Sequence, residues 1–242
     1  MIRCTECALR RTGAFKPLDE EDILYIDAMK RAHLALPAGA EIIVPGAENT
    51  ELYTLYSGWA YRYKELPDGR RQILHFLLPG DLIGLQAAMS EVPLYGVIAL
   101  TPVSICVLPR KRIWNLFGTM PELAFDVTWL GAREESHVDE NLTTVGRRAA
   151  AERIAALLVG LYRRLLGLGL VSEGNSFALP LTQQHIADAL GLSLVHTNKT
   201  MARLRRLGFY SQSDGMVTLP NPHALESLSQ FDALDDRLRP LI

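Results

Sequence analysis

The sequence lacks the features of a membrane, secreted or disulfide-stabilised protein. None of its apolar runs approaches the length of about 18 residues that a membrane-spanning helix needs. The N-terminus has no apolar segment of signal-peptide length, so we expect a cytoplasmic protein without a membrane partner. The chain has three cysteines, and this odd number argues against a disulfide framework.

Signatures of catalysis are missing as well. The sequence shows no Ser/His/Asp constellation, no phosphate-binding glycine loop and no histidine-rich metal motif, and its six histidines are scattered. We therefore expect no enzymatic activity. His75 lies between two apolar residues, and we interpret it as a packed core residue rather than a haem ligand.

The charge that is present is unevenly distributed. The 242 residues are enough for two domains, and their net charge is only −2. Residues 146–219 hold nine Lys and Arg against four Asp and Glu, whereas residues 1–145 hold 14 against 19. A basic segment behind an acidic one is the charge pattern expected of a protein that binds nucleic acid through one domain.

The most informative segment is LTQQHIADALGLSLVHTNKTMARLRRLG, at residues 181–208. Thr182 is predicted to cap a first helix, Gly191 to occupy a turn with positive φ, and Ser193 to cap a second helix over residues 194–207. The cations of the second helix are Lys199, Arg203, Arg205 and Arg206. A short helix, a tight turn and a basic second helix predict a helix-turn-helix that enters the DNA major groove. An ordinary helical hairpin is the alternative.

The residues on either side of this motif predict the rest of the architecture. FYSQSDGMVTL, at residues 209–219, predicts a strand, an Asp-Gly turn and a second strand, which would complete a winged helix. Helical spacing covers residues 19–33. Residues 34–108 alternate short β-type runs with turn signals, which indicates a compact β-barrel or jelly roll, and hence an α+β chain.

A long, charged helix is predicted from Pro121, with Gly146 as a hinge at its end. An apolar stripe of roughly heptad spacing follows this helix, and its proposed dimer contacts are Leu123, Val127, Leu130, Val138 and Leu142. The stripe either pairs with its copy in a homodimer, which we favour, or packs on the barrel.

The predicted parts follow a definite order. They are a cysteine-bearing segment (1–18), a barrel (19–119), a dimerisation helix (120–145), a winged helix (146–220) and a C-terminal helix and tail (221–242). This order resembles the Crp/Fnr family of bacterial transcription regulators. The most specific resemblances are LYTLYSGWAYRYKELPDGRRQILHFLLPGDLIGLQ (52–86), MPELAFDVTWLGAREE (120–135), GRRAAAERIAALL (146–158) and PLTQQHIADALGLSLVHTNKTMARLRRLGF (180–209).

The resemblance implies a homodimer that binds a two-fold symmetric operator in double-stranded DNA, with RNA polymerase as a further partner. It also implies that an effector signal passes from the barrel through the long helix to the DNA-binding domain. The alternative is a signalling module that binds a ligand or a protein and uses its winged helix for protein contacts. The effector and any cofactor remain unknown from the sequence.

The first departure from the family concerns the binding of cyclic nucleotides. Members that bind cyclic nucleotides have a Glu for the ribose and an Arg-Ser or Arg-Ala pair for the phosphate, and the corresponding residues here are Leu85 and Tyr95-Gly96. A buried phosphate without a cation would be strongly disfavoured, so cyclic AMP is not expected as the ligand.

The cysteines resemble those of Fnr proteins that carry an iron–sulfur cluster. Three of the family's four cluster ligands have a counterpart here, in Cys4, Cys7 and Cys106, which suggests oxygen or redox sensing. The third N-terminal cysteine of the family is missing, because its position falls at about Gly13. A carboxylate such as Asp19 could supply the fourth ligand, or one iron could stay without a protein ligand. Alternatively, Cys106 is a buried apolar residue and the Cys-x-x-Cys is a remnant or a redox pair.

The DNA-reading positions also differ from common members. The predicted DNA-binding residues are Thr182, Gln183, Ser193, Val195, His196, Asn198, Lys199 and Arg203. Lys199 could donate to guanine, Asn198 could pair with adenine or be merely solvated, and Val195 could contact a thymine methyl group. His196 is expected on a phosphate. We therefore expect an operator unlike those of well-known members.

Overall fold

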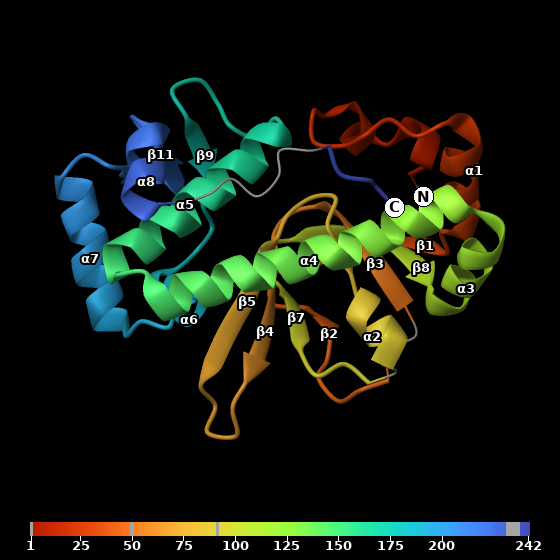
Figure 1. Ribbon diagram of the computed structural model, residues 1–242, viewed down its shortest axis with the longest axis horizontal. Helices are drawn as coiled ribbons and strands as arrows, with labels where there is room; N and C mark the ends of the chain where they lie inside the picture. The colour runs from red at the N-terminus through yellow and green to blue at the C-terminus, as the bar shows by residue number, and fades with distance from the viewer. Residues whose placement is uncertain (1, 49–50, 91, 231–237) are drawn as a thin grey trace.

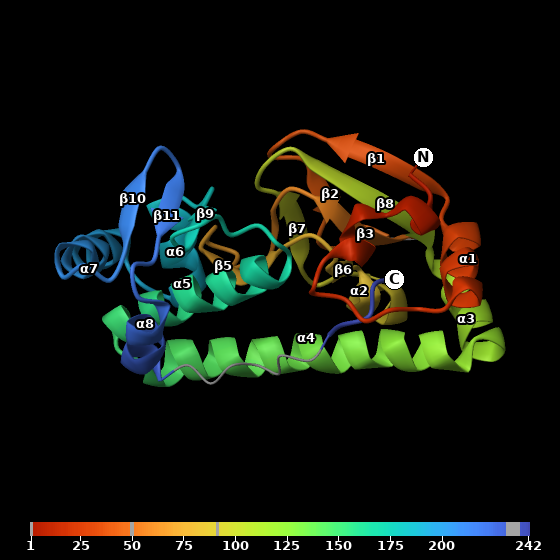
Figure 2. The ribbon, with the colours of Figure 1, turned by 90° about the horizontal axis from the view of Figure 1, so that it is seen from above.

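The computed structural model describes residues 2–48, 51–90, 92–230 and 238–242. A β-barrel lies at one end of the molecule and a winged-helix unit at the other, and one long helix, α4, runs alongside both (Figures 1 and 2). In the described ranges, no helix combines the length and the apolar character needed to cross a membrane.

The barrel consists of two four-stranded antiparallel sheets. One has the strand order β1-β8-β3-β6 and the other β2-β7-β4-β5. The strands are β1 (Ala32–Leu36), β2 (Glu41–Ile43), β3 (Glu51–Ser57), β4 (Ala60–Glu65), β5 (Arg71–Leu77), β6 (Leu82–Ile83), β7 (Gly96–Ala99) and β8 (Val103–Pro109). A short helix, α2 (Leu85–Ser90), interrupts the strands between β6 and β7. The predicted barrel is confirmed.

The N-terminal segment lies against one end of this barrel. It contains two 3-10 turns, η1 (Cys4–Glu6) and η2 (Ala8–Arg11), and then α1 (Glu20–Met29), whose N-cap Asp19 accepts a hydrogen bond from Asp22 N. The prediction of a helix up to His33 is wrong, because α1 ends four residues earlier. His33 lies in β1 and pairs with Cys106 of β8, so long-range strand pairing prevails over local helical spacing.

Helix α4 (Pro121–Arg147) follows α3 (Arg110–Thr119) and has proline in its first turn, where no backbone N–H is needed. The helix continues through Gly146, so the predicted hinge at that residue is wrong. The break lies at Arg148 and Ala149, both with extended backbone. The guanidinium of Arg148 fixes this corner, because it donates to Glu140, Thr144 and the Ser229 carbonyl.

The C-terminal unit is a winged helix. Its elements are α5 (Ala150–Gly167), β9 (Ser176–Ala178), α6 (Gln183–Leu190), α7 (Leu194–Arg206), β10 (Ser211–Ser213), β11 (Met216–Thr218) and α8 (Pro222–Ser229). The predicted hairpin is present, and Asp214 and Gly215 both have positive φ, as a two-residue type I′ turn requires. The sequence did not indicate β9, which pairs with β11 as a third strand.

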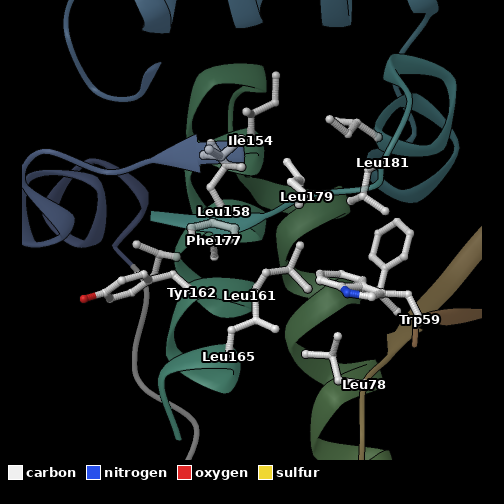
Figure 3. Close-up of a cluster of buried hydrophobic side chains, with 14 of the residues drawn as sticks. Trp59, Leu78, Ile154, Leu158, Leu161, Tyr162, Leu165, Phe177, Leu179 and Leu181 are labelled. Atoms are coloured by element: carbon white, nitrogen blue, oxygen red, sulfur yellow. The ribbon is translucent and has the colours of Figure 1, made fainter. Parts of the chain in front are cut away.

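One hydrophobic cluster joins the barrel to the winged helix. Trp59 and Leu78 of the barrel lie in the same buried cluster as Leu161 and Leu165 of α5 and Phe177 of β9 (Figure 3). Because these side chains share one core, the barrel and the winged-helix unit are packed together within a single chain rather than only tethered.

The end of the chain returns to the barrel. Arg239 forms a parallel bridge with Phe15, and Leu241 and Ile242 are buried. The Arg239 side chain pairs with Asp81, at the turn between β5 and β6, and Arg164 of α5 pairs with the same carboxylate. Residues 231–237, which link α8 to this tail, lie outside the described residues.

We expect Asp81→Ala to destabilise the protein strongly. The substitution leaves Arg164 and Arg239 largely buried without their carboxylate, which typically costs about 3–5 kcal/mol. The matched control is Asp68→Ala, which removes an exposed ion pair with Arg70 and should cost less than about 1 kcal/mol. Urea denaturation measures both values, and equal, small losses would contradict the structural role of Asp81.

Candidate nucleic-acid interface and sensor sites

The first helix of the helix-turn-helix is capped as predicted. The Thr182 hydroxyl accepts a hydrogen bond from His185 N at 3.2 Å, and Gly191 ends the helix with φ 61° and ψ 37°. This left-handed conformation favours glycine, and a Cβ here would also lie 3.2 Å from Val145 of α4. The turn therefore sets both the angle between the two helices and their distance from α4.

The second helix, α7, presents its polar side outward. Ser193 caps it by accepting from His196 N at 3.2 Å. Its inner face consists of Thr197, Thr200, Met201 and Leu204, all buried. The outer residues are Val195, His196, Lys199, Arg203, Arg205 and Arg206, all exposed. Since residues four apart lie on one helix face, Val195, Lys199 and Arg203 form one continuous ridge.

Three other predicted DNA-binding residues occupy different environments. Thr182 and Gln183 are exposed at the start of α6, where free backbone N–H groups favour an anion such as a phosphate. Asn198 is half-buried, and its Oδ1 atom is buried without a hydrogen-bond partner. It is thus less available to a base than Lys199 in this conformation, and its role as an adenine reader stays a prediction.

The position of the family's phosphate clamp is filled with side chains. Tyr95 is buried, and the guanidinium of Arg62 lies 5.3 Å from the centre of its ring. Arg62 also pairs at 3.3 Å with Glu134 from α4. Leu85 opens α2 where cyclic-nucleotide-binding members have a Glu, and it packs on apolar neighbours. An ion pair and a phenol therefore occupy the region where a cyclic phosphate would need a free cation.

The three cysteines converge, although they are far apart in the sequence. Cys4, Cys7 and Cys106 line one small cavity of about 20 Å³, together with Lys30 and the end of the chain. Burial raises the pKa of the Cys4 and Cys106 thiols, although the nearby Lys30 ammonium opposes the shift. Burial therefore disfavours the thiolate, the form that binds metal, at Cys4 and Cys106.

The donor set does not fit an iron–sulfur cluster with four protein ligands. Gly13 faces α5, since a Cβ at this residue would lie 3.8 Å from the Gly167 carbonyl oxygen. Asp19 is occupied as the N-cap of α1. Within the described ranges, no three His, Cys, Asp or Glu side chains are grouped so that they could hold a metal ion. The site provides three cysteines beside Lys30.

The predicted dimer residues of α4 separate into two groups. Leu123, Val127 and Leu130 are buried inside one protomer, in a cluster with α1, α3 and the barrel. They leave little surface for a partner, and their place in a dimer seam stays a prediction. Val138 and Leu142 are 42% and 70% exposed, and their spacing of four residues places them on one face.

His75 is a packed residue of the barrel, as predicted, and is only 8% exposed. Its ring lies 4.6 Å from the ring of His137 on α4, a neighbour that the sequence did not indicate. Burial lowers the pKa of both imidazoles, that of His137 to about 3, and nearby arginines add to the effect. The two rings are therefore neutral near pH 7.

Comparison with known proteins agrees with this arrangement. Residues 33–119 match the cyclic nucleotide-binding domain family, and residues 152–228 match the Crp-like helix-turn-helix domain family. The chain is 31% identical to the nitrogen fixation regulation protein FixK of Bradyrhizobium diazoefficiens, over 93% of each chain. It is 30% identical to the transcriptional activatory protein AadR of Rhodopseudomonas palustris, over 96% of this chain and 93% of that protein.

A solved structure shows the same fold. FixK2 from Bradyrhizobium japonicum superposes with a TM-score of 0.75 and 27% identity, and the match covers 84% of this chain and 98% of that one. The barrel, the long helix and the helix-turn-helix thus occur together in known regulators.

The exposed ridge of α7 leads to a prediction about DNA readout. On an operator selected from random DNA, Lys199→Ala should cost about 1–3 kcal/mol and relax selectivity at one base pair. Arg206→Ala should weaken binding to all sequences, because it removes a phosphate contact. The slope of the logarithm of DNA affinity against the logarithm of salt concentration should fall in magnitude by about 1. Gel-shift titrations at several salt concentrations measure both effects.

The control for these variants is Lys111→Ala, which removes an exposed cation from α3, at the opposite end of the molecule from α7 (Figure 1), and should leave affinity unchanged. If Lys199→Ala also bound the operator with unchanged affinity, α7 would not be the recognition helix.

Proposed function

The chain belongs to the Crp/Fnr family of DNA-binding transcription regulators, and we propose that it acts as a homodimer on a two-fold symmetric operator. The observation that carries this proposal is the exposed ridge of Val195, Lys199 and Arg203 on a helix whose other face is buried. Such a helix can enter a major groove, and two copies would reach half-sites one helical turn apart. RNA polymerase is the expected partner at the promoter.

We infer that the dimer contact lies on the second half of α4. Val138 and Leu142 are large apolar side chains exposed on a helix that is otherwise highly charged. Val145 follows at the next position of the same face and is half-buried. Pairing this face with its copy would bury the exposed apolar area close to the corner where α4 meets the DNA-binding unit.

We further propose that neither cyclic AMP nor an iron–sulfur cluster provides the signal. The Arg62 guanidinium is already engaged by Glu134 and Tyr95, so a cyclic phosphate would have to break an ion pair to enter. The cysteines match three of four ligands, Gly13 stands at about the position of the missing cysteine, and Asp19 is occupied as the N-cap of α1. The barrel therefore keeps the family fold while its usual sensor chemistry is altered.

The dimer proposal predicts the behaviour of Leu142→Asp. A carboxylate at this position would be desolvated twice across a two-fold axis, at about 3–5 kcal/mol for each uncompensated charge. The dimer dissociation constant should rise more than about 100-fold, and operator affinity should fall with it. Leu66→Asp, which places the same charge on an exposed residue of the β4–β5 turn, is the matched control.

Analytical ultracentrifugation measures the change in dimer dissociation. A Leu142→Asp protein that sediments as a dimer, like the Leu66→Asp control, would place the interface elsewhere on the molecule.

The cysteine proposal predicts a protein without bound iron. Purified and assayed without oxygen, the protein should be colourless and contain far less than the ~4 iron atoms of a [4Fe–4S] cluster. The triple Cys4→Ser, Cys7→Ser, Cys106→Ser variant should bind the operator with unchanged affinity. A brown protein with stoichiometric iron and sulfide that bleaches in air, and that loses its colour in the triple variant, would contradict this proposal.

A further inference from the structure

A cavity of about 220 Å³ lies where the three parts of the chain meet. The barrel contributes β5 around His75, α4 contributes His137 and Asn141, and α5 contributes Leu157 and Gly160. An apolar protein cavity of about 150 Å³ accommodates a benzene ring, so this cavity is large enough for a small organic molecule. Figure 2 shows α5 extending beside α4 in this part of the molecule.

The cavity contains a buried polar atom without a partner. The side chain of His75 is more than nine-tenths buried, and its Nε2 atom has no hydrogen-bond partner. A neutral imidazole nitrogen either donates or accepts one hydrogen bond, depending on the tautomer. Leaving such a group unsatisfied in a protein interior costs about 1–3 kcal/mol, which a ligand atom beside Nε2 would recover.

The charges around the cavity favour an anion. Four guanidinium groups line it, from Arg133, Arg163, Arg164 and Arg239. Two of them share Asp81 and a third pairs with Glu226, so part of their charge is neutralised. The carboxylate in the lining is Glu140, which is itself paired with Arg148 at 2.5 Å. Because Arg164 and Arg239 share the carboxylate of Asp81, these three groups together carry a net positive charge beside the cavity.

Apolar side chains form much of the remaining lining, beside the polar Asn141 and Thr144. Ile73, Phe76, Leu157, Leu161 and Leu190 contribute aliphatic and aromatic surface. A site that combines apolar walls with polar groups suits a ligand that has an apolar body and one polar head. An inorganic anion would leave the apolar part of this surface without a partner.

We propose that this cavity is a binding site for a small monocarboxylic acid of about six to eight carbon atoms. The carboxylate faces the arginines and His75, and the hydrocarbon part contacts the apolar walls. The acid would act as an effector, a role that rests on the proposed regulatory function. It would contact β5, α4 and α5 together. It would therefore favour the arrangement of barrel and DNA-binding unit seen here over any arrangement that separates them.

Calorimetric titration of the full-length protein tests the site with hexanoate and cyclohexanecarboxylate as probes. Both acids should give saturable binding, and their neutral amides should bind at least tenfold more weakly, because they lack the charge that the arginines attract. No saturable binding of either acid, or equal binding of the amides, would overturn the proposal.

Variants locate the binding within the molecule. Leu157→Trp fills the cavity and should abolish binding, whereas Leu166→Trp places the same ring at an exposed site on the same helix and should leave binding unchanged. His75→Phe should weaken binding about tenfold, and His75→Gln, which restores a polar group, should recover part of the loss. Unaltered binding in both Leu157→Trp and His75→Phe would show that the acids bind elsewhere.

DNA binding of the same proteins, measured with and without the acids, separates the two proposals. Wild-type protein that binds the acids but shows no salt-dependent retention on DNA in either condition would refute the regulator and leave the binding site standing. Retention on DNA without acid binding would refute only the site.

Discussion

Three distant segments of the chain meet at one buried carboxylate. Asp81 accepts a hydrogen bond from Leu78 N and pairs with Arg164 and Arg239. Burial alone would raise its pKa, but the two arginines outweigh burial and lower the pKa well below the usual range. Neither the carboxylate nor its two cations would be tolerated in this interior without the others. The turn of the barrel, the first helix of the DNA-binding unit and the C-terminal tail are therefore held together.

The sequence predicted best the parts that local chemistry determines. Thr182, Gly191 and Ser193 occupy the capping and turn positions expected of them, because capping depends on residues only three positions apart. Long-range contacts decided the rest. Periodicity could not distinguish Val127, which packs inside the protomer, from Val138, which is exposed. Nor could it indicate that the tail returns to Asp81, or that His75 and His137 share a cavity.

The sensor domain shows why fold and function must be argued separately. The barrel retains the family's fold, yet Tyr95, Arg62 and Glu134 fill the position of the phosphate clamp. The cavity of about 220 Å³, which is lined by arginines and by the neutral His75 and His137, lies where the barrel touches α4 and α5. A ligand at this position would act directly on the joint between sensor and DNA-binding unit, without a separate path through the barrel.

In the proposed homodimer, two copies of α7 read a symmetric DNA site. Repeated selection of bound fragments from a pool of random DNA, followed by sequencing, is the direct test. We expect an enriched sequence with two inverted half-sites whose centres are about 10 base pairs, or one helical turn, apart. Enrichment of a single unrepeated half-site, or of no sequence at all, would contradict a dimeric sequence-specific regulator.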